Sequence, residues 1–413
     1  MKFALSANDS GAWGEEPGSD SATPVLRSTE ISLDGYIDPN EPAMRKLSSR
    51  ERGATSLRAG DILVVKSSGS DAHLGKSGWV DERCRGMSFS NFIQRLRVSH
   101  DFDPRYTWYF LNSAAMKGQV RLLSSTSTGL QNLSGSLIGE IEIPRPPLGE
   151  QQRIADFLDA ETTRIDLVRQ QRARQRDVLT ELELSVIDDV LTQVRESPMV
   201  RLGYLAFVQT GVTVDSGRQH DDEAVTRPYL RVANVQVGYV DLNEISEITV
   251  SRRAAAASRL QVGDVLMTEG GDLDKLGRGT VWLGEIDDCL HQNHVFAVRP
   301  DANILTPEYL ALLTRAPMGR KYFESTGNKT TNLASTSSSK IRDLRIPLTD
   351  PNTQREMVKE VNTRLDSISD FEELISKQLR LLVERRQALI TAAVTGQFDV
   401  TTASGRSLPR GTA

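Results

Sequence analysis

Cysteines and long apolar runs are scarce in this sequence. Its two cysteines, Cys84 and Cys289, are too few for a disulfide framework or for a zinc site built on cysteine. No window approaches the roughly 18–20 consecutive apolar residues of a membrane-spanning helix. The only apolar run in the first ten residues is Phe3, Ala4 and Leu5, too short for a signal peptide. These absences predict a cytoplasmic protein with no membrane association.

A basic surplus is also missing. The 413 residues carry a formal net charge of −5, whereas proteins that neutralise DNA phosphates usually carry a basic excess. The charge is unevenly distributed, with net values of 0 for residues 1–148, −4 for 149–196, −2 for 197–350 and +1 for 351–413. Most of the acidic surplus therefore lies in 149–196, a segment that we expect to face protein partners rather than phosphate.

Motifs of catalysis and cofactor binding are absent as well. The sequence has no Gly-x-x-x-x-Gly-Lys-Ser/Thr phosphate loop, no Gly-x-Gly-x-x-Gly after a predicted strand, and no Asn/Asp-Pro-Pro-aromatic motif of amino-group methyltransferases. No lysine is preceded by Asp or Glu two positions earlier, an arrangement found in nuclease sites. His291 and His294 lie near Cys289, but no fourth metal ligand is evident, and polar packing is the favoured interpretation. We predict no catalytic residue, no bound metal and no cofactor for this chain.

The sequence does contain two copies of one module. Gly35-Tyr36-Ile37-Asp38 matches Gly238-Tyr239-Val240-Asp241, and Gly60-Asp61-Ile62-Leu63 matches Gly263-Asp264-Val265-Leu266, both at an offset of 203. Further matches follow in order along the chain, and Gln152-Arg153 matches Gln354-Arg355 at an offset of 202. A steady offset over this length indicates an internal duplication.

Each copy begins with short strand-like runs and turns and ends in one long helix. Residues 61–65 and 262–267 are predicted to be buried strands that end in loops. Residues 104–112 and 307–314 are predicted to be helices with proline in the first turn. The helix that ends each copy has about 40–45 residues and a length of roughly 60–65 Å.

A heptad seam runs along each long helix. In the second helix the seam carries Val361, Leu365, Ile368, Glu372, Ile375, Leu379, Leu382, Arg386, Leu389 and Ala393, so that Glu372 and Arg386 are charged interruptions. In the first helix it carries Ile154, Leu158, Ile165, Val168, Leu179, Leu182, Val186 and Val190, with Arg172 and Gln175 in the middle. Antiparallel pairing of the two helices satisfies both seams. The less favoured alternative folds each helix onto its own domain.

Loops rich in small, polar and basic residues follow strands at matching places in both copies. Small residues allow close approach of a backbone, Lys and Arg reach phosphate or guanine, and Asn and Gln suit the edge of adenine. The candidate DNA-contacting residues are Arg45, Lys46, Arg50, Lys66, Ser67, Ser68, Lys76, Thr128, Gln131 and Asn132 in the first copy, and Arg252, Arg253, Glu269, Gly270, Gly271, Lys275, Arg278, Asn328, Lys329 and Asn332 in the second. For any single residue a solvated loop or a structural turn is the simpler interpretation. The recurrence in both copies is what favours DNA contact.

Three further stretches resemble those of a known family. They are 146–154 (PPLGEQQRI), 384–397 (ERRQALITAAVTGQ) and 11–17 (GAWGEEP). Together with the duplication, they make nearly the whole chain similar to the specificity (S) subunits of type I restriction-modification systems.

The resemblance implies an α+β fold. Two similar target recognition domains are joined by two long helices that form an antiparallel coiled coil, with a pseudo-two-fold internal repeat. The expected division is 1–148 for target recognition domain 1, 149–196 for conserved helix 1, 197–350 for target recognition domain 2, 351–397 for conserved helix 2, and 398–413 for a C-terminal tail.

The resemblance also implies a non-catalytic DNA-recognition subunit in phage defence. Each domain reads one half of a bipartite asymmetric site on double-stranded DNA, and the coiled coil sets the spacer and docks two modification (methyltransferase) subunits. Restriction (translocase/endonuclease) subunits join this core. S-adenosylmethionine, ATP and Mg²⁺ are then used by the partner subunits in adenine-N6 methylation and ATP-dependent cleavage. The near-neutral domains predict weak DNA binding alone and tight binding within the complex.

Alternatives remain for the function and for the first domain. The chain could be an orphan subunit, a coiled-coil adaptor that does not bind DNA, or the recognition half of a single-chain restriction-methylation enzyme, although the missing motifs argue against the last. Residues 200–206 precede the second copy with little counterpart before Phe3. Either the first domain has a shortened N-terminal strand, or residues 396–400 return along the coil to complete it.

Overall fold

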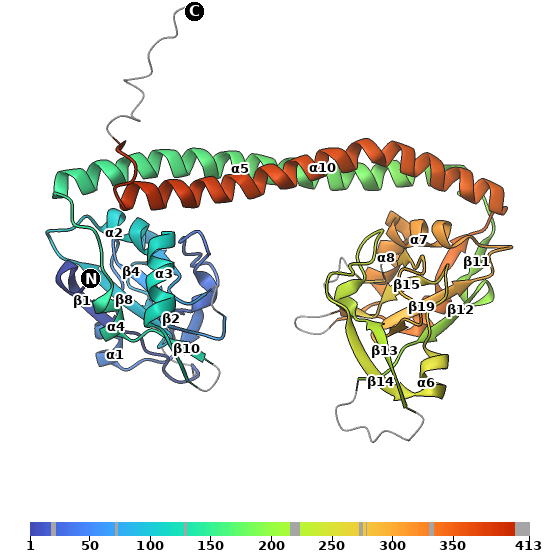
Figure 1. Ribbon diagram of the computed structural model, residues 1–413, viewed down its shortest axis with the longest axis horizontal. Coiled ribbons are helices and arrows are strands. Elements are labelled where there is room, and N and C mark those ends of the chain that lie inside the picture. The colour runs from blue at the N-terminus through green and yellow to red at the C-terminus, as the bar shows by residue number, and fades with distance from the viewer. Residues whose placement is uncertain are drawn as a thin grey trace, which may run out of the picture. The chain divides into compact units, whose positions relative to one another are not determined.

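The structure is a computed structural model that describes residues 1–17, 22–70, 73–127, 130–214, 224–271, 276–277, 279–329 and 334–400 (Figure 1). The chain divides into two compact units, Met1–Ala173 with Ser376–Ala413, and Arg174–Ile375. Each unit contains one globular domain and a part of each long helix. Within the described ranges, no helix is both long and apolar enough to span a bilayer.

Among its described residues, the first domain contains ten β-strands and four α-helices. The strands are β1 (Leu5–Ser10), β2 (Thr23–Leu26), β3 (Ala43–Arg45), β4 (Ile62–Val65), β5 (Ser67–Ser68), β6 (Ser77–Trp79), β7 (Ser88–Phe89), β8 (Ile93–Val98), β9 (Ser125–Ser127) and β10 (Leu130–Asn132). The helices are α1 (Ser49–Thr55), α2 (Pro104–Leu111), α3 (Ala114–Leu123) and α4 (Gly135–Glu140).

The second domain repeats this order and adds β11 and β22. Its strands are β11 (Met199–Arg201), β12 (Ala206–Thr210), β13 (Ala224–Leu230), β14 (Ser246–Ser251), β15 (Val265–Thr268), β16 (Gly270–Gly271), β17 (Gly279–Val281), β18 (Leu290–His291), β19 (Val295–Pro300), β20 (Asn328–Lys329), β21 (Ala334–Ser335) and β22 (Arg345–Pro347). Its helices are α6 (Arg252–Ala257), α7 (Pro307–Arg315), α8 (Pro317–Thr326) and α9 (Ser338–Asp343). The predicted strands at 61–65 and 262–267 correspond to β4 and β15, and the predicted helices to α2 and α7.

The two domains share one sheet topology. A four-stranded sheet has the order β1-β8-β4-β6 in the first domain and β12-β19-β15-β17 in the second. An outer sheet has the order β3-β2-β7 or β14-β13-β18, and a small sheet the order β5-β10-β9 or β16-β21-β20. The central strands β4 and β15 are wholly buried, as their runs of β-branched and aliphatic residues predict. The duplication in the sequence is therefore also a duplication of the fold.

The start of the first domain departs from the repeat. The strand pair β11–β22 of the second domain has no counterpart among the described strands of the first. There, the amino group of Met1 donates to the carbonyl of Ile141, and β1 begins only at Leu5. Among the described residues, the first domain thus lacks a counterpart of β11, whereas β1, with six residues, is not shorter than its counterpart β12, with five.

Two helices of equal length follow the domains. α5 (Leu148–Leu191) and α10 (Pro351–Val394) each contain 44 residues. In the first unit, Leu158 near the start of α5 shares a core with Val394 at the end of α10. In the second unit, Ile187 near the end of α5 shares a core with Val361 near the start of α10. Within each unit the two helices are therefore antiparallel, as the seams predict.

The predicted seam of α10 is confirmed, whereas that of α5 is partly wrong. Every seam position of α10 from Val361 to Ala393 is buried or half-buried, including Arg386 at 4% exposure. In α5, however, Val168 and Leu182 are 37% and 46% exposed. Arg169 and Glu183, one residue further along, are the half-buried residues. Hydrophobicity misleads here because the inward positions in the middle of α5 carry charged side chains.

A buried glutamine anchors the start of each long helix. The Gln151 Oε1 accepts from the Asp103 N–H at 2.9 Å, and its Nε2 donates to the Pro146 carbonyl at 2.9 Å. Gln354 makes the equivalent bonds to Thr306 and Thr349 at 2.8 and 2.7 Å. Both side chains are fully buried. The structural counterpart of Gln354 is therefore Gln151, at an offset of 203, and not Gln152 as the sequence match suggests.

The end of α10 is docked on the first domain. The Gln387 Nε2 donates to the Asn112 carbonyl at 2.9 Å, and the Thr391 Oγ1 accepts from the Ala114 N–H at 3.0 Å. Gly396 ends the segment with a φ of 74°, which favours glycine. Beyond it, Phe398 and Val400 pack into the core of the first unit. Residues 396–400 therefore return to this unit, although they add no strand to its sheets.

Candidate nucleic-acid interface

The structure brings together two loops that the sequence analysis treats separately. In the first domain, β5 pairs with β10, so that Ser67 lies opposite Asn132 and Ser68 opposite Gln131. In the second domain, β16 pairs with β21, and β21 pairs with β20, which contains Asn328 and Lys329. The small sheet of the first domain thus combines short polar side chains from both loops, whereas in the second domain the first loop contributes only the glycine backbone of β16.

A buried carboxylate fixes the strand that leads to each small sheet. Asp61 precedes β4 and accepts two bonds from the Arg97 guanidinium at 2.7 and 2.8 Å, and one from the Arg58 N–H at 2.9 Å. Asp264 precedes β15 and makes the same set with Arg299, at 2.7 and 2.8 Å, and with the Gln261 N–H at 2.8 Å. Charge-assisted paired bonds of this kind are strong and directional. The repeated Gly-Asp motif therefore has a structural role.

Two candidate lysines make internal contacts. The Lys66 Nζ donates to the Ser10 Oγ at 2.5 Å, and the Lys76 Nζ donates to the Ser28 carbonyl at 2.9 Å. Burial lowers the pKa of both ammonium groups, because removal from water penalises the charged form. Lys76 is partly buried and held by the domain, which fits a structural role better than a phosphate contact.

The basic candidates of the first domain differ in exposure. The Arg45 guanidinium lies 4.1 Å from the centroid of the Trp13 ring and pairs with Glu16. Its side chain is only 13% exposed. By contrast, Lys46 and Arg50 are exposed. Of the three, Lys46 and Arg50 are the ones free to reach a phosphate.

The basic candidates of the second domain lie at the start of a helix. Arg252 and Arg253 are the first two residues of α6 and are exposed. The Ser251 Oγ caps this helix by accepting from the Ala254 N–H. Arg45, Arg50, Arg252 and Arg253 thus belong to the outer sheets or to the helices beside them, whereas Lys329 belongs to the small sheet of the second domain.

The polar candidates of the second domain bond to neighbouring side chains. A Glu269 carboxylate oxygen lies 2.5 Å from the His294 Nδ1, and the Asn328 Oδ1 accepts from the Lys340 Nζ at 2.9 Å. Gly270 and Gly271 form β16 itself, so here the predicted loop is a short strand.

His291 is fully buried, with its Nδ1 2.5 Å from the Val295 carbonyl. Among the described residues there is no group of three side chains able to hold a metal ion.

Four candidates, Thr128, Lys275, Arg278 and Asn332, lie outside the described residues. Lys329 is placed by its backbone in β20.

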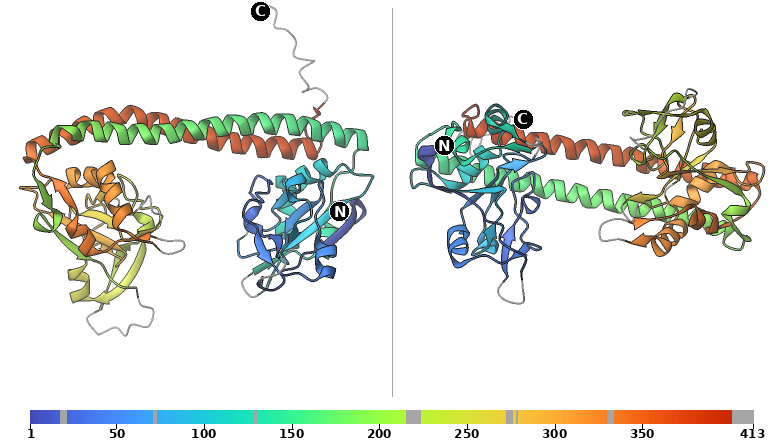
Figure 2. Two further views of the ribbon diagram at one scale, coloured as in Figure 1. Left: turned by 180° about the vertical axis from the view of Figure 1, so that it is seen from behind. Right: turned by 90° about the horizontal axis from the view of Figure 1, so that it is seen from below.

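Some of the candidate segments lie at one end of their domain. α1 and β10 in the first unit, and α6 with β14 in the second, lie at the end away from α5 and α10 (Figures 1 and 2). In the first domain this end therefore combines the exposed Arg50 of α1 with the backbone and amide side chains of β10, and in the second domain it carries the exposed Arg252 and Arg253 of α6. The arginines suit phosphate contacts, and the amide side chains suit base-edge contacts.

Sequence reasoning missed four buried residues that fix a strand of each domain or the start of its long helix. Asp61, Asp264, Gln151 and Gln354 make bonds in corresponding positions of both domains. The signal for the two aspartates was present, because each lies in a matched Gly-Asp pair. Gly11, in the opening motif, is required for packing, since a Cβ there would overlap the backbone of Phe89 and Ser90.

The comparisons with known proteins agree on one family. The model of the type I restriction modification DNA specificity domain matches residues 36–174. The chain is 23% identical over 355 residues to the specificity subunit of the type I restriction enzyme EcoKI of Escherichia coli K12, a match that covers 82% of this chain and 75% of that protein. It is 21% identical over 349 residues to the specificity subunit of the type I restriction enzyme StySPI of Salmonella potsdam, covering 82% and 74%.

A solved structure shares the fold over nearly the full length. It comes from work on the complex assembly and conformational transition of the type I restriction-modification system. The match to one of its chains has a TM-score of 0.62 at 16% sequence identity and covers 96% of this chain and 97% of that chain.

Proposed function

Because the chain belongs to the specificity subunits of type I restriction-modification systems, we propose that it reads a bipartite, asymmetric site on double-stranded DNA. Each domain reads one half-site, and the paired helices set the spacer between them. The observation that carries this proposal is the duplicated fold, in which each domain builds the same small sheet from two polar loops. One reading surface per domain is what a two-part site requires.

The two long helices supply surfaces for partner subunits. Val168 and Leu381 in the first unit are 37% and 53% exposed, and both are apolar. The residues 203 positions away, Phe371 and Val178 in the second unit, are each 60% exposed. Exposed apolar side chains on a helix favour a protein partner. A pair that recurs in both units fits the docking of two modification (methyltransferase) subunits.

The chemistry is assigned to the partners. We propose that the chain is non-catalytic, that the modification subunits use S-adenosylmethionine to methylate adenine N6, and that restriction subunits use ATP and Mg²⁺ to translocate and cleave DNA. A flipped adenine would enter the pocket of a modification subunit, not of this chain. Buried, unbridged Cys84 and Cys289 agree with a proposed cytoplasmic location.

Methylome sequencing of the host with and without the gene tests the reading of DNA. The expected result is one split adenine-methylation motif that is lost with the gene and restored by complementation. A restored motif with altered bases in the first half only is expected when Ser67, Ser68 and Gln131 are replaced. As a control, replacement of the exposed Arg385 on α10 should leave both halves unchanged. No gene-dependent split motif would support an orphan subunit or an adaptor without DNA, and methylation by the purified chain alone would support a single-chain enzyme.

The spacer function has its own test. Insertion of one heptad into α5 and α10 together should lengthen the spacer and leave the bases of both half-sites unchanged, because a seven-residue insertion keeps the seam in register. Altered half-site bases in the methylome would contradict this division of roles.

A further inference from the structure

The two charged interruptions of the α10 seam, Arg386 and Glu372, have different surroundings. In the first unit, the buried Arg386 lies against a loop of its domain. Its Nη2 is 3.4 Å from the Asp34 carbonyl and 3.4 Å from the Tyr36 hydroxyl, and its Nε is 3.4 Å from the Asp166 carboxylate of α5. The loop therefore faces both helices through polar groups.

The same loop is bonded to α5. The Tyr36 hydroxyl donates to the Asp166 carboxylate at 3.0 Å, and the Arg169 guanidinium bridges Asp34 and Asp166 at 3.0 and 2.9 Å. The Tyr36 ring also packs against Trp108 of α2, with ring centroids 5.9 Å apart. Asp34, Tyr36, Asp166, Arg169 and Arg386 are called the junction network below.

Other polar bonds join the first domain to its helices. The Tyr109 hydroxyl donates to the Asp159 carboxylate at 2.7 Å, and the Arg105 guanidinium pairs with the same carboxylate at 2.6 Å. Gln387 and Thr391 of α10 bond to the backbone between α2 and α3. Hydrogen bonds are directional, so this set specifies one orientation of the domain on the helices.

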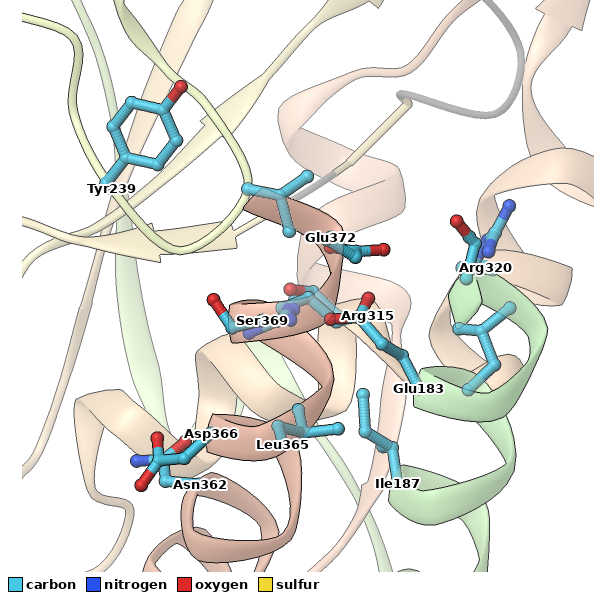
Figure 3. A pocket seen from close by; sticks show the side chains of 14 residues that line it. Glu183, Ile187, Tyr239, Arg315, Arg320, Asn362, Leu365, Asp366, Ser369 and Glu372 are labelled. Atoms are coloured by element: carbon cyan, nitrogen blue, oxygen red, sulfur yellow. The ribbon is translucent and has the colours of Figure 1, made fainter. Parts of the chain in front are cut away.

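The second unit carries none of the ionic partners of this network. At an offset of 203, Asp34 corresponds to Val237, Asp166 to Ser369, Arg169 to Glu372 and Arg386 to Glu183. Glu183 and Glu372 face the same space (Figure 3), and burial together with the charge of Glu183 raises the pKa of Glu372.

Pockets of similar volume lie at corresponding places in the two units. The one in the second unit, of about 600 Å³, is lined by residues that include Glu183, Tyr239, Arg315, Ser369 and Glu372, and the one in the first unit, of about 570 Å³, by residues of the junction network. Figure 3 shows Tyr239 across the pocket from both glutamates, and its side chain is 60% exposed. The second-unit residue that corresponds to Trp108 is Ala311, so Tyr239 has no aromatic ring beside it equivalent to the Trp108 ring that packs against Tyr36.

The attachment of the second domain is correspondingly apolar. Ile187, Val361 and Leu365 share a core with Tyr309 and Leu313. Within the described parts of 180–191 and 355–375, no helix side chain makes a hydrogen bond or an ion pair with the domain. Gln354, at the start of α10, supplies its polar bonds. Apolar contact is non-directional, and a packed interface of this kind permits small sliding motions.

We propose that the junction network acts as a set of positioning residues that hold the first recognition domain in one orientation on its helices. The second domain, which lacks the network, adjusts its orientation on the apolar seam. This inference rests on the proposed function only for its consequence, namely that the second domain accommodates small changes in the spacer between half-sites.

Spin-label distances within each unit of the full-length chain test the proposal without DNA. In the first unit, labels are placed at Glu82→Cys and Arg164→Cys, and in the second at the corresponding Glu285→Cys and Ser367→Cys. All four positions are exposed, and the native thiols are buried. The expected distance distribution is at least about twice as wide in the second unit as in the first, as sliding by a few ångströms would produce.

Two sets of variants assign the difference to the network. R386Q should widen the first distribution toward that of the second unit, R386K should widen it less because the charge remains, and the exposed R385Q should leave it unchanged. In the second unit, the triple substitution E183R/S369D/E372R should narrow the distribution.

Equal widths in the unmodified protein, or an unchanged first width in R386Q, would overturn the proposal. If R386Q unfolds the first domain, the test rests on the triple variant of the second unit. If its distance distribution does not become narrower than that of the unmodified unit, the junction network is not the cause of the difference between the units. Because no DNA is present, these outcomes are independent of whether the methylome shows a gene-dependent motif.

Discussion

Removal of the buried carboxylate of Asp264 should destabilise the second unit strongly. The side chain is fully buried and accepts bonds from Arg299 and from the Gln261 N–H, all between 2.7 and 2.8 Å. Loss of one partner of a buried ion pair costs about 3–5 kcal/mol. Arg299 is 29% exposed and can be partly hydrated once freed, so Asp264→Ala should cost about 3 kcal/mol.

Calorimetry of the full chain measures this cost. A unit of this size loses about 2–4 °C in Tm per kcal/mol, which gives a decrease of about 6–12 °C in the transition of the second unit. The exposed pair Asp189–Arg364, at 2.7 Å, is the control, since Asp189→Ala should cost less than about 1 kcal/mol. In D264A/R299M no unpaired guanidinium remains, so this variant should be more stable than D264A. The reasoning fails if D264A costs no more than the control, or if the double variant recovers nothing.

Three further outcomes are expected. Burial raises the pKa of Cys84 to about 11 and that of Cys289 to about 12, so both thiols should react at pH 8 at least about 10-fold more slowly with a disulfide reagent than after unfolding. Folding raises the pKa of Glu372, so the charged carboxylate destabilises the folded second unit at neutral pH. Glu372→Gln should therefore stabilise this unit by up to about 1 kcal/mol at pH 7, and the gain should disappear below about pH 4, where the glutamate is protonated in both states. Guanidinium denaturation at the two pH values measures the difference. Gln354→Ala leaves buried backbone groups without hydrogen-bond partners and should lower the free energy of unfolding by about 2 kcal/mol in the same guanidinium assay. An unchanged unfolding midpoint would contradict the anchoring role of Gln354.

The fold was predictable because its signals are local and occur twice. The Gly-Asp pairs mark the turns before β4 and β15, and proline marks the first turns of α2 and α7. The heptad seam of α10 predicts its inward residues because hydrophobicity and position agree there. In α5 they disagree at Val168 and Leu182. Beside Val168, the half-buried Arg169 makes an ion pair with Asp34 of the domain, a long-range contact that a local pattern does not reveal.

The candidate site was predictable as loops but not as sheets. β5 and β16 contain two residues each, too few for any alternation pattern, and they form only by pairing with strands some 65 residues away. For the same reason the sequence does not reveal that the Lys76 ammonium group is turned toward the Ser28 carbonyl or that Arg45 stacks on Trp13. These contacts depend on tertiary neighbours. A basic residue in a loop gives the same sequence signal whether it contacts DNA or another part of its own domain.

The acidic surplus of 149–196 has a different explanation from the one its net charge suggests. Asp156 and Asp159 pair with Arg105, and Asp189 pairs with Arg364. These three carboxylates of α5 are therefore paired with arginines of their own units, which reduces the charge that the helix offers to a partner.

Among mostly polar exposed residues, the helices also present apolar side chains outward, as Val178 and Phe371 show at 60% exposure each. Apolar contacts are insensitive to salt, whereas DNA binding weakens steeply as counterions compete. Raising the salt concentration from about 0.1 M to about 0.5 M should therefore release DNA from the assembled complex before it releases the modification subunits. Size-exclusion chromatography across this range of salt concentrations shows whether DNA or the modification subunits are released first. Release of the modification subunits before DNA would show that their docking depends on the acidic charge of α5.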